Sequence, residues 1–92
     1  MINKDSLAEK GWLPTSVPCI YVRYRNVKET IYGFYIDLDT GRLIVEFDID
    51  KNDNVWARGL NHMKLIYTYN REEMDMGLLT ELCDTVIEAW SV

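Results

Sequence analysis

The stretch TIYGFYIDLDTGRLIVEFDI, residues 30–49, decides the fold class. It holds two runs rich in Tyr, Ile, Val and Phe, a composition typical of strands, separated by the turn sequence Asp-Thr-Gly. We favour a four-residue loop from Leu38 to Gly41, with Gly41 at positive φ, because a one-residue slip would exchange the two faces of a strand. The predicted pairs are Phe34 with Val45, Tyr32 with Phe47, and Ile36 with Leu43.

Two further runs extend this hairpin into a sheet. CIYVRYR, residues 19–25, precedes it, and HMKLIYTY, residues 62–69, follows it. The later run is expected to bring Leu65, Tyr67 and Tyr69 to one face. Residues 12–18 contain two prolines and are predicted to be an extended connection. The sequence therefore predicts an antiparallel sheet of about four strands.

Two helices are expected at the ends of the chain. Residues 5–11, DSLAEKG, contain the capping-box pattern Ser-Leu-Ala-Glu and end at Gly11, which indicates a short N-terminal helix. Asn70, with Glu73 three positions later, predicts the start of a long C-terminal helix. Its apolar residues recur at spacings of three and four: Met74, Leu78, Leu79, Leu82, Cys83, Val86, Ile87 and Trp90. We predict an α+β fold in one domain, residues 1–92, with the long helix packed on one face of the sheet.

Length and composition exclude several classes of protein. A chain of 92 residues with 48% hydrophobic residues suits one compact core, and it holds no run long enough for a membrane span. The N-terminus lacks the apolar run of a signal peptide, so a cytoplasmic protein is expected. Cys19 and Cys83 match no metal or redox spacing, and His62 is the lone histidine. We therefore expect no cofactor, no membrane partner and no enzyme.

The stretch FDIDKNDN, residues 47–54, resembles a calcium loop in its density of oxygen ligands. Its acidic and amide residues are Asp48, Asp50, Asn52, Asp53 and Asn54. A calcium loop of the helix–loop–helix type needs Gly at its sixth position and Glu at its twelfth, and both possible registers fail at both positions. Asp and Asn also cap their own backbone in turns, so a solvated turn is predicted.

The two faces of the sheet are expected to differ. The predicted helix-facing residues are Ile20, Val22, Phe34, Ile36, Val45 and Phe47, and the predicted outer residues are Tyr21, Arg23, Arg25, Ile31, Tyr35, Ile44 and Glu46. Tyr21, Tyr35 and Ile44 are candidate partner-binding residues because they make the outer face apolar. Alternatively, Tyr and Ile are simply favoured in strands. The net charge of −5 argues against direct binding of nucleic acid by this face.

The acidic excess lies in the C-terminal helix. Residues 1–71 hold all ten Lys and Arg and nine acids, whereas residues 72–92 hold six acids and no base. Glu81, Asp84 and Glu88, here called the acidic ridge, follow helical spacing opposite the apolar stripe. Glu88 also lies near the helix end where the dipole disfavours a negative charge. The ridge either maintains solubility or meets a basic surface.

These features favour a small acidic, non-enzymatic protein-binding module. A phage- or mobile-element-type inhibitor, anti-defence or immunity-like, that blocks a nucleic-acid-handling enzyme would use the acidic ridge against a protein partner with a basic surface. The alternative is a structural or accessory protein that forms a homodimer or larger homo-oligomer through the open sheet face.

Overall fold

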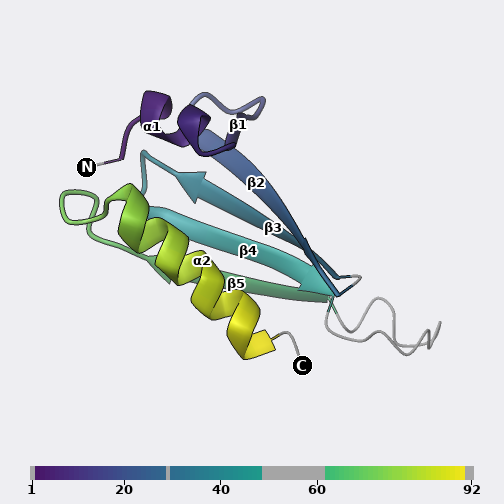
Figure 1. Ribbon diagram of the computed structural model, residues 1–92. Coiled ribbons are helices and arrows are strands. Elements are labelled where there is room, and N and C mark those ends of the chain that lie inside the picture. Colours follow the sequence, from purple (N-terminus) through teal and green to yellow (C-terminus); the bar gives the residue numbers. More distant parts are fainter. Residues whose placement is uncertain (1, 29, 49–61, 91–92) are drawn as a thin grey trace.

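The computed structural model describes residues 2–28, 30–48 and 62–90 of the chain. Its elements are α1 (Lys4–Glu9), β1 (Leu13–Pro14), β2 (Ile20–Val27), β3 (Thr30–Asp37), β4 (Arg42–Asp48), β5 (His62–Thr68) and α2 (Met76–Trp90). The strands form one antiparallel sheet in the order β1-β2-β3-β4-β5, and both helices lie on the same side of it (Figure 1). The predicted α+β class is confirmed, with five strands rather than about four.

The additional strand is β1, which lies in the segment predicted to be an extended connection. Leu13 pairs with Val22 and Pro14 pairs with Tyr21. Proline is tolerated at the edge of a sheet because its missing N–H removes no hydrogen bond from the ladder when it faces outward. Two residues of β1 therefore cover part of the outer edge of β2.

The β3–β4 hairpin has the predicted register. Phe34 pairs with Val45 and Ile36 with Leu43, across a loop of residues 38–41 in which Gly41 has a φ of +75°. The Asp37 carboxylate accepts hydrogen bonds from the N–H groups of Asp39 and Thr40 in the loop, at 2.9 and 3.2 Å. The loop length is therefore fixed both by a glycine at positive φ and by a side chain that satisfies the turn backbone.

Both helices begin at a different residue from the one predicted. In α1 the cap is Asn3, whose side chain accepts from the Ser6 N–H at 2.9 Å while the Ser6 hydroxyl accepts from the Asn3 N–H at 3.2 Å. In α2 the Asp75 carboxylate accepts from the Leu78 N–H at 2.8 Å. Asn70 caps a separate turn before the helix, where its side chain accepts from a backbone N–H at 3.0 Å. The two acids between these caps therefore precede α2 instead of occupying its first turn.

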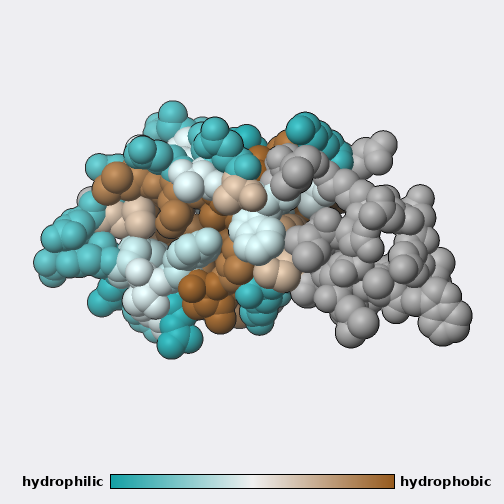
Figure 2. Space-filling model, turned by 90° about the horizontal axis from the view of Figure 1, so that it is seen from below, coloured by the Kyte–Doolittle hydropathy of each residue, from teal (hydrophilic) through white to brown (hydrophobic). Residues whose placement is uncertain are grey.

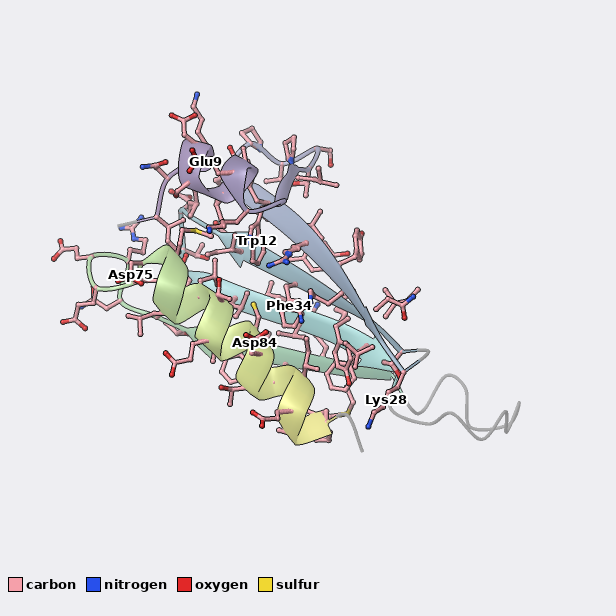
Figure 3. The ribbon with its side chains drawn as sticks, in the orientation of Figure 1. Glu9, Trp12, Lys28, Phe34, Asp75 and Asp84 are labelled. Atoms are coloured by element: carbon pink, nitrogen blue, oxygen red, sulfur yellow. The ribbon has the colours of Figure 1, made fainter. Side chains whose placement is uncertain are left out.

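The core lies between the sheet and the two helices. Its seven largest fully buried side chains are Leu7, Tyr32, Phe34, Ile36, Leu43, Val45 and Leu79. Figure 3 shows Trp12 between α1 and the sheet, and Phe34 in the space between α2 and the sheet. On α2 the buried residues are Leu79, Cys83, Val86 and Ile87. Leu78, which was predicted to belong to the same stripe, is 48% exposed, so the buried stripe of α2 is narrower than predicted.

The faces of β2 are the reverse of the predicted ones. Cross-strand partners share a face, and Arg23 pairs with the buried Phe34 whereas Val22 pairs with Tyr35. Tyr21, Arg23 and Arg25 therefore lie on the helix side, and Ile20 and Val22 lie on the open side. Long cationic side chains can lie on the helix side because their apolar stems cover the core while their charged ends reach solvent or an acid.

In the described parts of the chain, no helix combines the length and the apolar character that crossing a membrane requires.

Candidate protein-binding surfaces

An apolar row crosses the open face of the sheet from one edge to the other. Directly paired residues on successive strands form it: Leu13, Val22, Tyr35, Ile44 and Ile66. Leu13 and Ile66, at the two ends, are each 56% exposed, and among the described elements neither helix lies over this face. At a strand spacing of about 4.8 Å, the row is about 19 Å long. Within the row Val22 is buried at 6% exposure, and Tyr35 and Ile44 are partly exposed, so its accessible surface lies at the two ends and over the middle of the sheet.

Two mixed rows flank the apolar row, each two residues away along the strands. One consists of Ile20, Asp37, Arg42 and Thr68, and the other consists of Tyr24, Gly33, Glu46 and Lys64. In the second row the Lys64 ammonium lies 3.9 Å from the Glu46 carboxylate, and both side chains are more than a third exposed. The apolar row is therefore bordered on each side by one acid and one base.

The tyrosines beside the row support each other. The hydroxyl groups of Tyr24 and Tyr35 lie 3.3 Å apart, and their rings meet edge to face with centroids 6.4 Å apart. The hydrogen bond with Tyr24, together with partial burial, raises the pKa of Tyr35 to about 12, so the ring stays neutral at physiological pH. Gly33 lies beneath these rings, and a Cβ there would lie 3.2 Å from the Tyr35 ring. A glycine at this position thus permits the close packing of the two tyrosines on the open face.

A shallow hollow of about 170 Å³ lies beside the apolar row. Its lining residues come from β2, β3, β4 and β5: Ile20, Tyr35, Asp37, Ile44, Glu46 and Lys64. The Asp37 carboxylate in this lining is committed to the β3–β4 turn. Partial burial alone would raise its pKa, but the hydrogen bonds from the loop N–H groups outweigh burial and hold the pKa below its usual range. The hollow has room for one side chain of a partner.

Of the three candidate partner-binding residues predicted for the open face, the structure places two there and one elsewhere. Tyr35 and Ile44 are directly paired partners in the middle of the apolar row. Tyr21 pairs with the buried Ile36 and packs against the core on the helix side, so the prediction that it faces outward is wrong. Leu13, Val22 and Ile66 also belong to the row, although none of them was predicted to lie on the open face.

The acidic ridge lies on the exposed side of α2, but it has a cationic partner. Glu81, Asp84 and Glu88 are all exposed. Arg25 of β2 places its Nη1 3.0 Å from Oδ1 of Asp84, and Figure 3 shows Asp84 on α2 near the middle of the helix. Although residues 72–92 contain no base, Asp84 is therefore paired with a base from the sheet. Within the described part of the chain, no base lies within salt-bridge distance of Glu81 or Glu88.

A second apolar surface lies along the edge formed by β5 and α2. Figure 2 shows this side of the molecule, where hydrophobic residues gather along the middle between hydrophilic residues on both sides. On α2, Leu78 is 48% exposed and lies one helical turn before Leu82, which, like Leu65 of β5, is partly buried against the core. Among the described strands β5 is the last of the sheet, so its outer backbone groups have no neighbouring strand.

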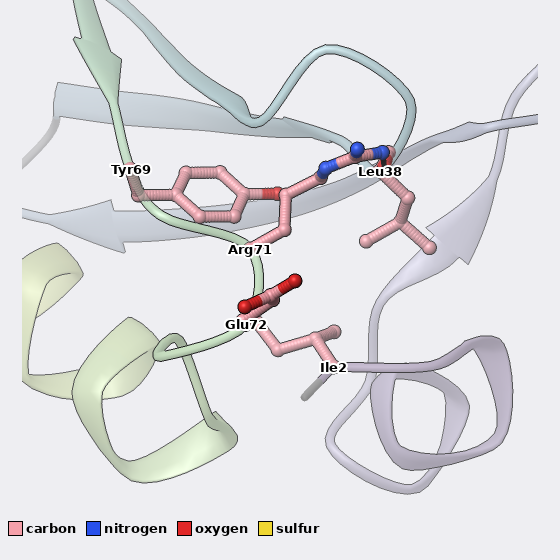
Figure 4. Close-up of a pocket in the computed structure, with 5 residues that line it drawn as sticks. All are labelled: Ile2, Leu38, Tyr69, Arg71 and Glu72. Carbon is pink, nitrogen blue, oxygen red and sulfur yellow. Dashed lines mark hydrogen bonds between the residues drawn. The ribbon is translucent and has the colours of Figure 1, made fainter.

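A pocket of about 250 Å³ lies where the start of α1 meets the β3–β4 loop and the turn before α2 (Figure 4). Arg71 in its wall donates from Nη1 to the backbone oxygens of Leu38 and Asp39, at 3.1 and 2.9 Å. The Tyr69 hydroxyl donates to the backbone oxygen of Asp37 at 3.2 Å. Because the Tyr69 and Arg71 side chains already bind the turn backbone, their role here is to hold the turn against β5.

The remaining candidate groups offer little chemistry. Burial raises the pKa of the Cys83 thiol to about 12, which keeps the thiol protonated. Among the described residues no group of three or more His, Cys, Asp or Glu side chains is arranged to hold a metal ion. Most of the stretch FDIDKNDN, from residue 49 onward, lies outside the described residues, so its predicted role as a solvated turn stays a prediction.

Comparison of the chain with protein-family models, with curated proteins and with solved structures found no match in any of the three.

Proposed function

We propose that the chain is a non-enzymatic module that binds another protein through the open face of its sheet. The observation that carries this proposal is the apolar row, in which Leu13 and Ile66 are more than half exposed. An exposed apolar row with a charged border is typical of a protein-binding surface, because burying it removes apolar area from water while the border sets orientation. The hollow beside Tyr35 and Ile44 supports this, since it can receive a side chain of the partner.

The catalytic alternative has less support. Among the described residues, both thiols have a pKa raised above the usual range, that of Cys19 chiefly by burial, so neither is an activated nucleophile. The proposed module acts by occupying a surface of its partner, and we place it in the cytoplasm.

A second candidate function uses the acidic ridge. Glu81 and Glu88 project from the side of α2 away from the sheet. Glu88 lies in the last turn, where the helix dipole disfavours a negative charge. A protein partner with a basic surface, such as a nucleic-acid-handling enzyme that the module inhibits, would compensate both charges. The Arg25–Asp84 pair weakens this candidate, because among the described residues it leaves two ridge acids without a base instead of three.

Photo-crosslinking in the native host distinguishes the two candidates. A photoreactive phenylalanine derivative is placed at Ile66 on the open face, at Glu88 on the acidic ridge, or at Leu78 as a control of similar exposure to Ile66. The proposal predicts that position 66 gives a defined cross-linked protein and that the control does not. Cross-linking at position 88 alone would transfer the function to the acidic ridge. A defined product at position 78 alone would transfer it to the β5–α2 edge.

A further inference from the structure

We propose that the partner of the open face is a second copy of this chain, related by a twofold axis that runs parallel to the apolar row. This inference rests on the proposed function, because it names the occupant of the same surface. It follows from how the charged residues beside the row are ordered along β4.

The order of side chains on β4 makes the face complementary to itself. Arg42 and Glu46 lie on the open face on either side of Ile44, each two residues away. A twofold axis parallel to the row places each residue of the row opposite the same residue of the second copy. The strands of the second copy then run in the opposite direction, so the residues on the two sides of the row exchange places. Arg42 of one copy then faces Glu46 of the second copy, and the same contact occurs twice. Facing sheets pack about 10 Å apart, a distance that these two long side chains can bridge.

The other simple arrangement brings like charges together where its axis lies over β3 or β4. A twofold axis parallel to the strands places every residue of the strand on the axis against the same residue of the second copy. On β3 this opposes Asp37 to itself, and on β4 it opposes both Arg42 and Glu46 to themselves. Like charges placed directly opposite each other disfavour these two positions of the axis. Midway between β3 and β4 the same axis opposes Asp37 to Arg42, but it leaves Glu46 opposite Gly33 and leaves β1 without an opposing strand. The axis parallel to the row is favoured because it compensates both charges of β4 and keeps the whole apolar row in contact.

The size of the face predicts a reversible dimer. The five strands span about 19 Å and the four long ones have seven or eight residues each, which gives a face of at most about 19 Å by 23 Å at ordinary strand dimensions. Two such faces bury roughly 900 Å², which is below the roughly 1,200 Å² at which standard stable interfaces begin. We therefore expect dissociation in the micromolar range. The dimer would leave both copies of α2 on the outside, so the two acidic ridges would point in opposite directions.

Sedimentation equilibrium of the purified full chain, between about 5 and 500 µM, tests the arrangement through a charge-reversal cycle. Arg42→Glu and Glu46→Arg are measured singly and together, with Glu81→Arg as a control on α2. Each single reversal opposes like charges across the interface and should weaken the dimer at least about tenfold, whereas the double reversal should restore it to within about threefold of the parent. The control should dimerise as the parent does.

Contacts within one copy cannot produce that rescue. Within one copy, Arg42 lies opposite Asp37 on the neighbouring strand and Glu46 lies beside Lys64. The double variant therefore places like charges beside each other at both positions, so any rescue must come from contacts between copies. Circular dichroism of each variant shows whether it is folded before its mass is interpreted. A parent that dimerises without rescue by the double variant would overturn the arrangement and direct attention to the β5 edge. A parent that is monomeric throughout would overturn the second copy as partner; a cross-link from position 66 to a different protein would then still support the proposed function.

Discussion

Replacing Leu79 by alanine tests whether the buried side of α2 holds the helix on the sheet. Leu79 is fully buried, and its neighbour Leu78 is 48% exposed although both were predicted to face the core. A fully buried Leu→Ala change costs about 2.7–5.0 kcal/mol, out of roughly 5–14 kcal/mol for a domain of this size. Leu78→Ala removes the same atoms from the same helix with the same change in helix propensity, so it is a matched control. At half exposure it should cost less than about 1 kcal/mol.

Urea unfolding followed by circular dichroism measures both variants. With a slope of about 1–3 kcal/mol per molar urea, Leu79→Ala should lower the unfolding midpoint by at least about 1 M, whereas Leu78→Ala should stay close to the parent. Equal shifts for the two variants, or a larger shift for Leu78→Ala, would mean that α2 is rotated about its axis relative to the described packing.

Three further predictions concern local contacts. A double-mutant cycle of Arg25→Ala and Asp84→Ala should give a coupling of about 0.2–1 kcal/mol that shrinks in high salt, because the two side chains are 30% and 56% exposed. A coupling of zero would show that Arg25 does not stabilise Asp84. Gly41→Ala should cost about 1–3 kcal/mol and more than Gly11→Ala: both have positive φ, but only at Gly41 would the new Cβ meet a backbone oxygen at 3.0 Å. The Asp37 carboxyl has a folded pKa below its unfolded value, so its contribution to stability should be complete above the unfolded pKa and disappear as the pH falls through the folded pKa. Asp37→Ala should therefore differ from the parent in stability at neutral pH and less so in acid. A difference that does not narrow in acid would contradict this.

The hairpin could be predicted from the sequence because its loop carries a strong signal. Gly41 marks the position that needs positive φ. A loop one residue longer or shorter would exchange the two faces of a strand, so the requirement that the apolar residues share one face decides between the two loop lengths. The β2–β3 connection has no such signal. Val27 pairs with Thr30 across two residues, with Lys28 at a φ of +50°, and lysine is not a residue that indicates this conformation. The sequence therefore does not determine which alternate residues of β2 face the helices, and the prediction assigned them to the wrong faces.

The start of α2 illustrates a second limit. Asn70 and Asp75 both accept backbone N–H groups, so both carry the signature of a cap. Only the packed structure shows that the first caps a turn and the second caps the helix. The exposed Leu78 has the same origin, because helical spacing alone does not fix the width of the buried stripe.

The candidate surface could be predicted in part. Tyr35 and Ile44 were found because they lie in the hairpin whose register could be derived. Val22 was assigned to the wrong face with the rest of β2, and Leu13 lies in a strand too short to be recognised. Arg25 reaches Asp84 across 59 positions of sequence, so the partial neutralisation of the acidic ridge depends on tertiary structure that no local pattern reports.

Nuclear Overhauser effects between copies test the proposed surface most directly. In an equimolar mixture of ¹³C-labelled and unlabelled chains, at a concentration where sedimentation shows dimers, isotope-filtered spectra report only contacts between two copies. The twofold axis parallel to the apolar row predicts contacts from the Ile44 and Ile66 methyl groups to the same residues of the second copy. Contacts from the Leu78 methyl groups, with none from Ile44 or Ile66, would show that the dimer forms through the β5–α2 edge and would contradict the open face as the binding surface.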